Sequence, residues 1–194
     1  IKKKTNNIRF KIYKFKKKNF ANLNFNKLPN LIGVLNLTPD SFSDGGKFNT
    51  QNRGIKHAME MYKSGASIID VGGESTRPGS KTLDKKIEWK RIHKILKSIC
   101  KKVPVSLDTR KSEIMEKGIK LGVKIINDVS GLNYDNNTID ILKKYRVPFI
   151  LQHSKGTPEN MQINPSYKNE LLDIYDFFEK KIKFLRSIGI KHNN

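Results

Sequence analysis

The sequence contains a single cysteine, Cys100, and no long apolar run. One cysteine excludes an intramolecular disulfide framework and a metal site built from several cysteines, and it suits a reducing compartment such as the cytoplasm. No segment approaches the ~18 consecutive apolar residues that a membrane-spanning helix needs. Apolar residues still make up 36% of the 194 residues and occur in separated runs, so most of the chain can bury a core.

Acidic residues are scarce, and residues 1–30 contain none. The formal charge is +21, from 39 Lys and Arg against 18 Asp and Glu. Residues 1–30 hold ten of the basic residues, so about half of the excess belongs to this segment. Lysine and asparagine are abundant, which is what an AT-rich coding sequence produces whatever the function. We therefore expect residues 1–30 to be a disordered basic leader, and we expect no nucleic-acid partner.

From Leu31 onward, short apolar runs alternate with segments of helical period. This alternation predicts βα units and a parallel sheet. We expect five helices, the last ending near residue 188, and five strands, at 31–35, 67–71, 103–107, 123–126 and 147–151. Three glycines, Gly65, Gly122 and Gly189, lie where helices are expected to end.

Polar side chains close each predicted strand. In parallel α/β folds the carboxyl ends of the strands share one face, and ligands bind there. We therefore expect a binding site at the strand ends, which carry Asn36, Asp70, Glu74, Asp108, Asn127, Asp128, Gln152 and His153. Repeats of this length fit both a (β/α)8 barrel and a doubly wound sheet.

Two loops carry the side chains with the most chemistry. The first, residues 36–46, reads NLTPDSFSDGG, and its oxygens suit a hard cation or a substrate amine. The second, residues 72–79, reads GGESTRPG, and its hydroxyls and guanidinium suit pyrophosphate. By composition alone each loop could equally be a mobile connector, because Gly, Pro, Ser and Asp are ordinary turn formers.

From Leu31 to about Gly189 the sequence resembles dihydropteroate synthase, a family of the pterin-binding TIM-barrel superfamily. The stretches NLTPDSFSDGG and IIDVGGESTRPG match two signature loops of that family, and SLDTRK and IINDVSG then follow in the family's order. The resemblance implies an α/β fold, a (β/α)8 TIM barrel. Residues 31–194 would form its N-terminal part, with about five strands and five helices.

This family condenses 6-hydroxymethyl-7,8-dihydropterin diphosphate with p-aminobenzoate and releases pyrophosphate. The resemblance implies that Asn36 helps to hold Mg²⁺ against the diphosphate. It also implies catalytic roles for Thr76 and Arg77, which would engage the diphosphate or order the p-aminobenzoate site. The partners are then small molecules and not a membrane, and the family's dimers favour a homodimer.

The resemblance assigns the pterin itself to other residues. Asp108 and Asn127 would hydrogen-bond its edge of donors, for which a carboxylate is a suitable acceptor. Pro39 and Phe42 of the first loop would close over the site and exclude water. Gln152 would lie against the flat pterin.

Two departures separate this sequence from the family's pattern. Gln152, His153 and Ser154 stand where the family usually has Met-His-Met, so an amide replaces a thioether against the pterin. The family's later motifs, which include an Asp-Pro-Gly loop and a terminal Arg-x-His, have no counterpart here. Five strands cannot close an eight-stranded barrel. We therefore expect the chain to be a truncated synthase.

Other interpretations stay open at this point. The chain could be a non-catalytic remnant, half of a split enzyme, or a pterin-binding methyltransferase domain, although such a domain would not need the two signature loops. We also expect structural roles for several residues outside the proposed ligand set. Loop ordering is expected of Asp44, Asp70 and Glu74, and turn capping of Asp128. His57 and His93 are expected to be ordinary surface or packing residues, His153 to be structural, and Cys100 to fill the core.

Overall fold

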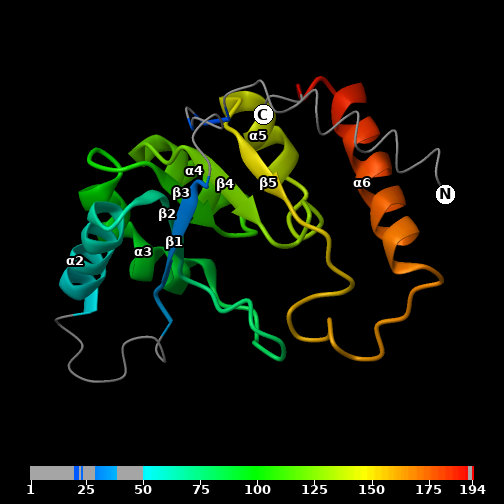
Figure 1. The fold of residues 1–194 in the computed structure, drawn as a ribbon, viewed down its shortest axis with the longest axis horizontal. Coiled ribbons are helices and arrows are strands. Elements are labelled where there is room, and N and C mark those ends of the chain that lie inside the picture. Colours follow the sequence, from blue (N-terminus) through cyan, green and yellow to red (C-terminus); the bar gives the residue numbers. More distant parts are fainter. Residues whose placement is uncertain (1–19, 22, 24–28, 39–49, 192–193) are drawn as a thin grey trace.

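A five-stranded parallel sheet organises the chain (Figure 1). The computed structural model describes residues 20, 21, 23, 29–38, 50–191 and 194. The strands lie side by side in chain order, and they are β1 (Leu31–Asn36), β2 (Ala66–Gly72), β3 (Val105–Asp108), β4 (Ile125–Asp128) and β5 (Phe149–Leu151). The helices of the described residues are α2 (Thr50–Lys63), α3 (Lys85–Ile99), α4 (Ser112–Leu121), α5 (Thr138–Tyr145) and α6 (Glu170–Ser187).

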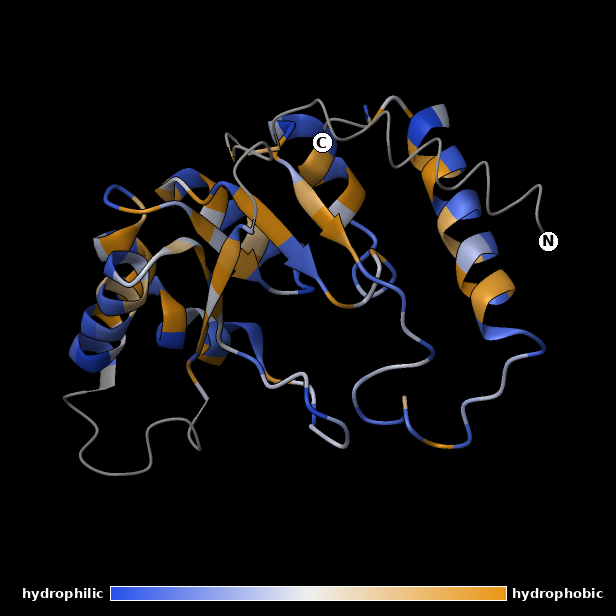
Figure 2. Cartoon of the chain, viewed as in Figure 1, coloured by the Kyte–Doolittle hydropathy of each residue, from blue (hydrophilic) through white to orange (hydrophobic). Residues whose placement is uncertain are grey.

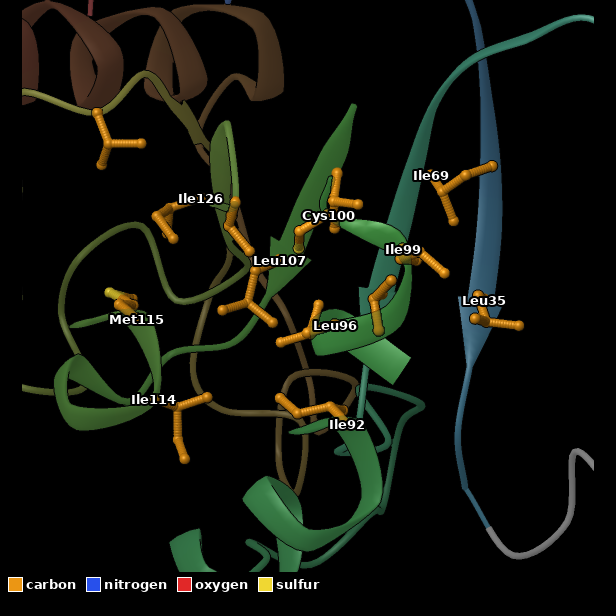
Figure 3. Close-up of a cluster of buried hydrophobic side chains, with 14 of the residues drawn as sticks. Leu35, Ile69, Ile92, Leu96, Ile99, Cys100, Leu107, Ile114, Met115 and Ile126 are labelled. Carbon is orange, nitrogen blue, oxygen red and sulfur yellow. The ribbon is translucent and has the colours of Figure 1, made fainter. Parts of the chain in front are cut away.

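The core lies between the sheet and the helices that connect its strands. Ile69, Leu107 and Ile126 of neighbouring strands are fully buried and meet the apolar stripe of α3, which includes Ile92 and Leu96 (Figure 3). Apolar residues dominate the strands, whereas the helices alternate between apolar and polar residues (Figure 2). This is the pattern expected when a sheet is covered by amphipathic helices.

Cys100 ends α3 inside this core. Burial raises the pKa of its thiol to about 11, so the side chain stays protonated and unreactive at neutral pH. The expected packing role of this cysteine is confirmed.

The predicted strands and helix ends agree with the structure to within two residues, and three strands, β3, β4 and β5, start two residues later than expected. β3 and β5 begin directly after Pro104 and Pro148. Proline has no N–H to give to the ladder, so regular pairing can only begin at the prolyl carbonyl. These two carbonyls accept hydrogen bonds from the neighbouring strands, from Ile69 and Ile126.

The three predicted helix-ending glycines have positive φ angles. Gly122, with φ +103°, ends α4, and its N–H bonds the carbonyls of Gly118 and Ile119. A side chain is strained in that conformation, which is why glycine suits the position.

The last helix packs against the core only near its end. Leu185 is 5% exposed, whereas Leu171, at the start of the same apolar stripe, is 82% exposed. In Figure 1, α6 lies beyond β5, at the edge of the sheet. No described helix combines the length and the apolar character needed to cross a membrane. The expected leader falls mostly on residues outside the described ranges.

Candidate functional site

Three of the expected site residues form a row across the ends of the strands. The strand register pairs Asn36 with Gly72, Gly72 with Asp108, and Asp108 with Asn127. Gly72 contributes no side chain to this row. A Cβ placed there would lie 3.5 Å from Asn36 Oδ1 and 3.4 Å from Asp108 Oδ2. The two oxygens therefore border the same open space above Gly72, as the strand-end prediction requires.

A chain of hydrogen bonds fixes the orientation of Asn127. Its Nδ2 donates to Asp70 Oδ2 at 3.2 Å, and its Oδ1 accepts from Gln152 Nε2 at 2.8 Å. Asp70 of β2 thus orients a side chain of β4, across the intervening β3, and does not order a loop through this bond. Gln152 contacts another predicted ligand residue through a bond that a methionine could not make.

Asp108 is a half-buried acid, and the charges that shift its pKa, among the described residues, are those of other acids. Its Oδ1 is buried and has no hydrogen-bond partner among the described residues. Burial, and then the charges of Asp70 and Glu88, raise the pKa of Asp108 to about 8. An unpaired buried acceptor is costly, so a ligand that brings N–H donors to Asp108 would remove an existing penalty.

Asp128 has a different role from Asp108. Its Oδ1 accepts hydrogen bonds from the backbone N–H and the hydroxyl of Ser130, at 2.8 and 2.6 Å. The expected turn-capping role of Asp128 is therefore confirmed. Burial still raises the pKa of this carboxyl, against those two bonds.

A cavity of about 560 Å³ opens beside the row. Thr76 and Gln152 line it, together with Tyr134 and Met161. His153 also lines it and packs edge-on against Phe177, with ring centroids 4.8 Å apart. Gln152 connects the cavity to the row because it also bonds Asn127.

Of the remaining predicted substrate-binding residues, the structure describes only Arg77. Arg77 is on the exposed side of the second loop, with its backbone N–H bonded to Ser75 Oγ, and it does not line the cavity. Pro39 and Phe42 lie outside the described residues, as does Asp44. The roles assigned to these residues stay predictions.

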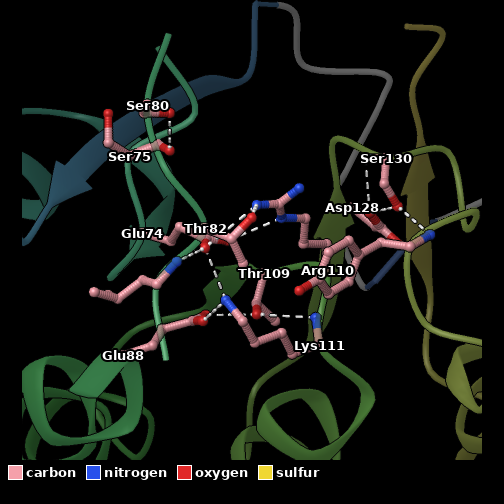
Figure 4. A network of polar contacts seen from close by, with 12 residues as sticks. Glu74, Ser75, Ser80, Thr82, Glu88, Thr109, Arg110, Lys111, Asp128 and Ser130 are labelled. Atoms are coloured by element: carbon pink, nitrogen blue, oxygen red, sulfur yellow. Dashed lines mark hydrogen bonds and ion pairs between the residues drawn. The ribbon is translucent and has the colours of Figure 1, made fainter. Parts of the chain in front are cut away.

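Behind the row lies a buried network of four charged side chains, Glu74, Glu88, Arg110 and Lys111 (Figure 4). Arg110 Nε lies 3.0 Å from Glu74 Oε2. Lys111 Nζ lies 2.9 Å from Glu74 Oε1 and 2.6 Å from Glu88 Oε2. Thr109 Oγ1 donates to the other oxygen of Glu88 at 2.6 Å.

Sequence reasoning assigned a loop-ordering role to Glu74, which is confirmed, but it missed the other three charges. Two signals were available. Glu88 lies four residues before Ile92, on the apolar stripe of α3, where an acid needs a partner. Arg110 and Lys111 follow the end of β3 directly and could have been that partner.

The oxygens above Gly72 fit a hard cation better than a soft one. Within the described ranges no group of three or more His, Cys, Asp or Glu could hold a metal ion by itself. An amide oxygen and a carboxylate oxygen facing one space suit Mg²⁺, which takes few protein ligands and completes its shell with water and phosphate.

Comparison with known proteins agrees with this geometry. The family model described as "Pterin binding enzyme" matches residues 32–194. Dihydropteroate synthase of Clostridium beijerinckii is 41% identical over 166 residues, covering 84% of this chain and 59% of the relative. The enzyme of Neisseria meningitidis serogroup C is 40% identical, with coverage of 84% and 58%. This chain thus spans less than two thirds of the length of these relatives.

The chain is also similar to solved structures of dihydropteroate synthases. A dihydropteroate synthase from Clostridium difficile, crystallised in the presence of pteroic acid, has a TM-score of 0.76 at 39% identity. The Yersinia pestis enzyme, in complex with a sulfonamide drug, has a TM-score of 0.77 at 36% identity. Each comparison covers 84% of this chain and 60% of the other. The five parallel strands therefore correspond to part of a TIM barrel.

Proposed function

The chain belongs to the family of pterin-binding enzymes, and on that premise we propose that it carries the pterin and diphosphate part of a dihydropteroate synthase site. The reaction would join 6-hydroxymethyl-7,8-dihydropterin diphosphate to p-aminobenzoate. The observation that carries the proposal is the open space above Gly72, where oxygens of Asn36 and Asp108 converge beside the cavity lined by Thr76 and Gln152.

The strand-end row would bind the pterin. The pterin's edge of N–H donors would meet the carboxyl of Asp108, whose Oδ2 faces the space above Gly72, and the amide of Asn127 offers one further donor and acceptor in an orientation that Asp70 fixes. Because Asp108 is half-buried beside other acids, pairing it with donors supports binding more than pairing an exposed acid would.

The second loop would act on the leaving group. Thr76 and Arg77 donate hydrogen bonds to the diphosphate as the C–O bond breaks and its electron pair moves onto the leaving oxygen. The arylamine nitrogen then forms the C–N bond and loses a proton, so no protein nucleophile is needed. Pro39 and Phe42 would exclude water, which competes with the amine.

Asn36 would hold Mg²⁺ with its Oδ1 above Gly72, and diphosphate oxygens would complete the coordination. When bound, the ion supplies positive charge that stabilises the departing diphosphate. We include a cytoplasmic location and a homodimer in the same proposal, because one buried cysteine suits a reducing compartment and the family forms dimers.

Two measurements on the full 194-residue chain test the proposal. Calorimetry with 6-hydroxymethyl-7,8-dihydropterin should show binding, and addition of p-aminobenzoate to the diphosphate ester with Mg²⁺ should release pyrophosphate. Arg77→Ala should lower turnover more than pterin affinity, since its side chain would act on the leaving group. Absence of pterin binding would contradict the proposal. Binding without pyrophosphate release would support the site and contradict the activity of this chain.

A further inference from the structure

One buried carboxylate joins the two ends of the loop that carries Thr76 and Arg77. Glu74 Oε1 accepts a hydrogen bond from the backbone N–H of Leu83 at 2.6 Å. This bond holds the two ends of the loop formed by residues 75–82 next to each other. The side chain of Glu74 is only 4% exposed. Arg91 of α3 also bonds the carbonyl of Gly73, at 2.8 Å, beside this closure.

The cations that hold Glu74 come from the segment that follows Asp108. Arg110 binds it with Nε and also donates from Nη2 to Thr82 Oγ1 at 3.0 Å. Lys111 binds it from the other side and is itself held by Glu88. The base of the loop is therefore attached to the strand end that carries the predicted pterin ligand (Figure 4).

Two further hydrogen bonds attach the loop to residues 158 and 159. Gly79 N–H donates to the carbonyl of Pro158 at 2.7 Å, and Thr82 N–H donates to Glu159 Oε1 at 3.0 Å. The bond to Glu159 is exposed, so water competes for it, whereas the bonds of Glu74 are shielded. The position of Thr76 and Arg77 therefore depends mainly on the buried base.

We propose that Glu74 is a positioning residue, which holds Thr76 and Arg77 at a fixed distance from Asp108 so that one substrate meets both. The inference deepens the proposed function and rests on it. Among the described residues, loss of the Glu74 charge would leave Lys111 paired with Glu88 and would remove the ion pair of Arg110. Two buried cations with one anion favour opening toward water, so residues 75–82 would separate from the strand end.

The test compares Glu74→Gln with Glu113→Gln. Glu113 also binds two lysines, Lys85 and Lys117, but it is 43% exposed and lies on the surface of α4. Calorimetry would use two probes, 6-hydroxymethyl-7,8-dihydropterin and its diphosphate ester with Mg²⁺. In Glu74→Gln we expect affinity for the ester to fall about tenfold while affinity for the alcohol stays within about twofold. Glu113→Gln should change neither.

If Glu74 had a purely structural role, Glu74→Gln would lower the affinity for both probes equally, and that result would overturn the inference. Unchanged affinity for the ester would also overturn it. The double variant Glu74→Gln/Arg110→Gln, which replaces the ion pair by two neutral amides, should recover part of the lost affinity for the ester, and its failure to do so would count against the pairing.

A ligand-free measurement separates this inference from the proposed function. Trypsin cleaves after Lys81, inside the loop, and cleavage in Glu74→Gln should be about tenfold faster than in the wild type or Glu113→Gln, because the open form is populated more often. If the wild type binds neither pterin probe, the proposed function fails, yet faster cleavage would still support the loop attachment. Unchanged cleavage would overturn it.

Discussion

The acids near the strand ends differ in their partners. Glu74 and Glu88, the paired set, bind Arg110 and Lys111, whereas Asp108, the unpaired set, has a carboxyl oxygen with no partner among the described residues. The pKa values of Glu74 and Asp108 are shifted in opposite directions.

Burial works to raise the pKa of Glu74, but hydrogen bonds from Arg110, Leu83 N–H and Lys111 outweigh it, and the pKa lies below the ordinary value. The pKa of Asp108 is raised to about 8, because it is half-buried beside other acids. Arg110 and Lys111 follow Asp108 almost directly in the sequence, yet they bind the glutamates. Paired acids therefore order the fold here, whereas the unpaired acid remains available to a ligand.

The largest expected effect lies in the paired set. Lys111→Met removes the shared partner of Glu74 and Glu88 and leaves excess negative charge in the core, so it should lower the free energy of unfolding by about 3–5 kcal/mol. Urea unfolding followed by circular dichroism would measure this. Lys117→Met removes a partly exposed partner of Glu113 and should cost less than about 1 kcal/mol. Equal losses in the two variants would contradict the distinction between buried and exposed pairs.

The second effect lies in the unpaired set. At pH 9, above the pKa of about 8, Asp108→Ala removes a charged acceptor, so pterin affinity should fall about 10–100-fold, as for a lost hydrogen bond to a charged group. Calorimetry with 6-hydroxymethyl-7,8-dihydropterin would measure the change. Asp140→Ala, which removes an exposed acid from the first turn of α5, is the control and should leave the affinity unchanged. Unchanged pterin affinity in Asp108→Ala would remove this residue from the site.

The third prediction concerns the pH dependence of stability, which has opposite signs for Asp108 and Glu74. The folded state holds the proton of Asp108 more tightly than the unfolded state does, so its contribution to stability is present below about pH 4 and is lost as pH rises through about 8. Glu74 has the opposite sign, and its contribution is lost as pH falls below its ordinary value near 4.5. Asp108→Asn should therefore be more stable than the wild type at pH 9, by about 1–2 kcal/mol given partial solvent screening. A difference that did not shrink toward pH 4 would contradict the assignment.

The same contrast explains what could be predicted from the sequence. The strands, the helix-ending glycines and the shared face of Asn36, Asp108 and Asn127 follow from local pattern, because periodicity and strand direction determine them. The late start of β5 could have been read from Pro148. Glu88 on the apolar stripe of α3 signals that a buried cation is needed, but local pattern cannot choose that cation, because Lys111 lies 23 residues away and the packing of α3 against α4 brings the two together.

The smallest effect is expected where this sequence departs from its family. Gln152→Met removes the donor to Asn127 Oδ1 but leaves Asp70 to hold Nδ2, and the thioether adds a polarizable surface beside the pterin. The lost hydrogen bond is worth about 1 kcal/mol, and the new contact offsets part of it, so pterin affinity should change less than about fivefold. Calorimetry on Gln152→Met beside Ser154→Met, which changes a neighbouring cavity residue, would measure the difference. A loss of pterin affinity above about tenfold in Gln152→Met alone would show that the Gln152 amide itself binds the ligand. The groups available to a ligand would then include a neutral amide directly after β5 as well as the carboxyl of Asp108.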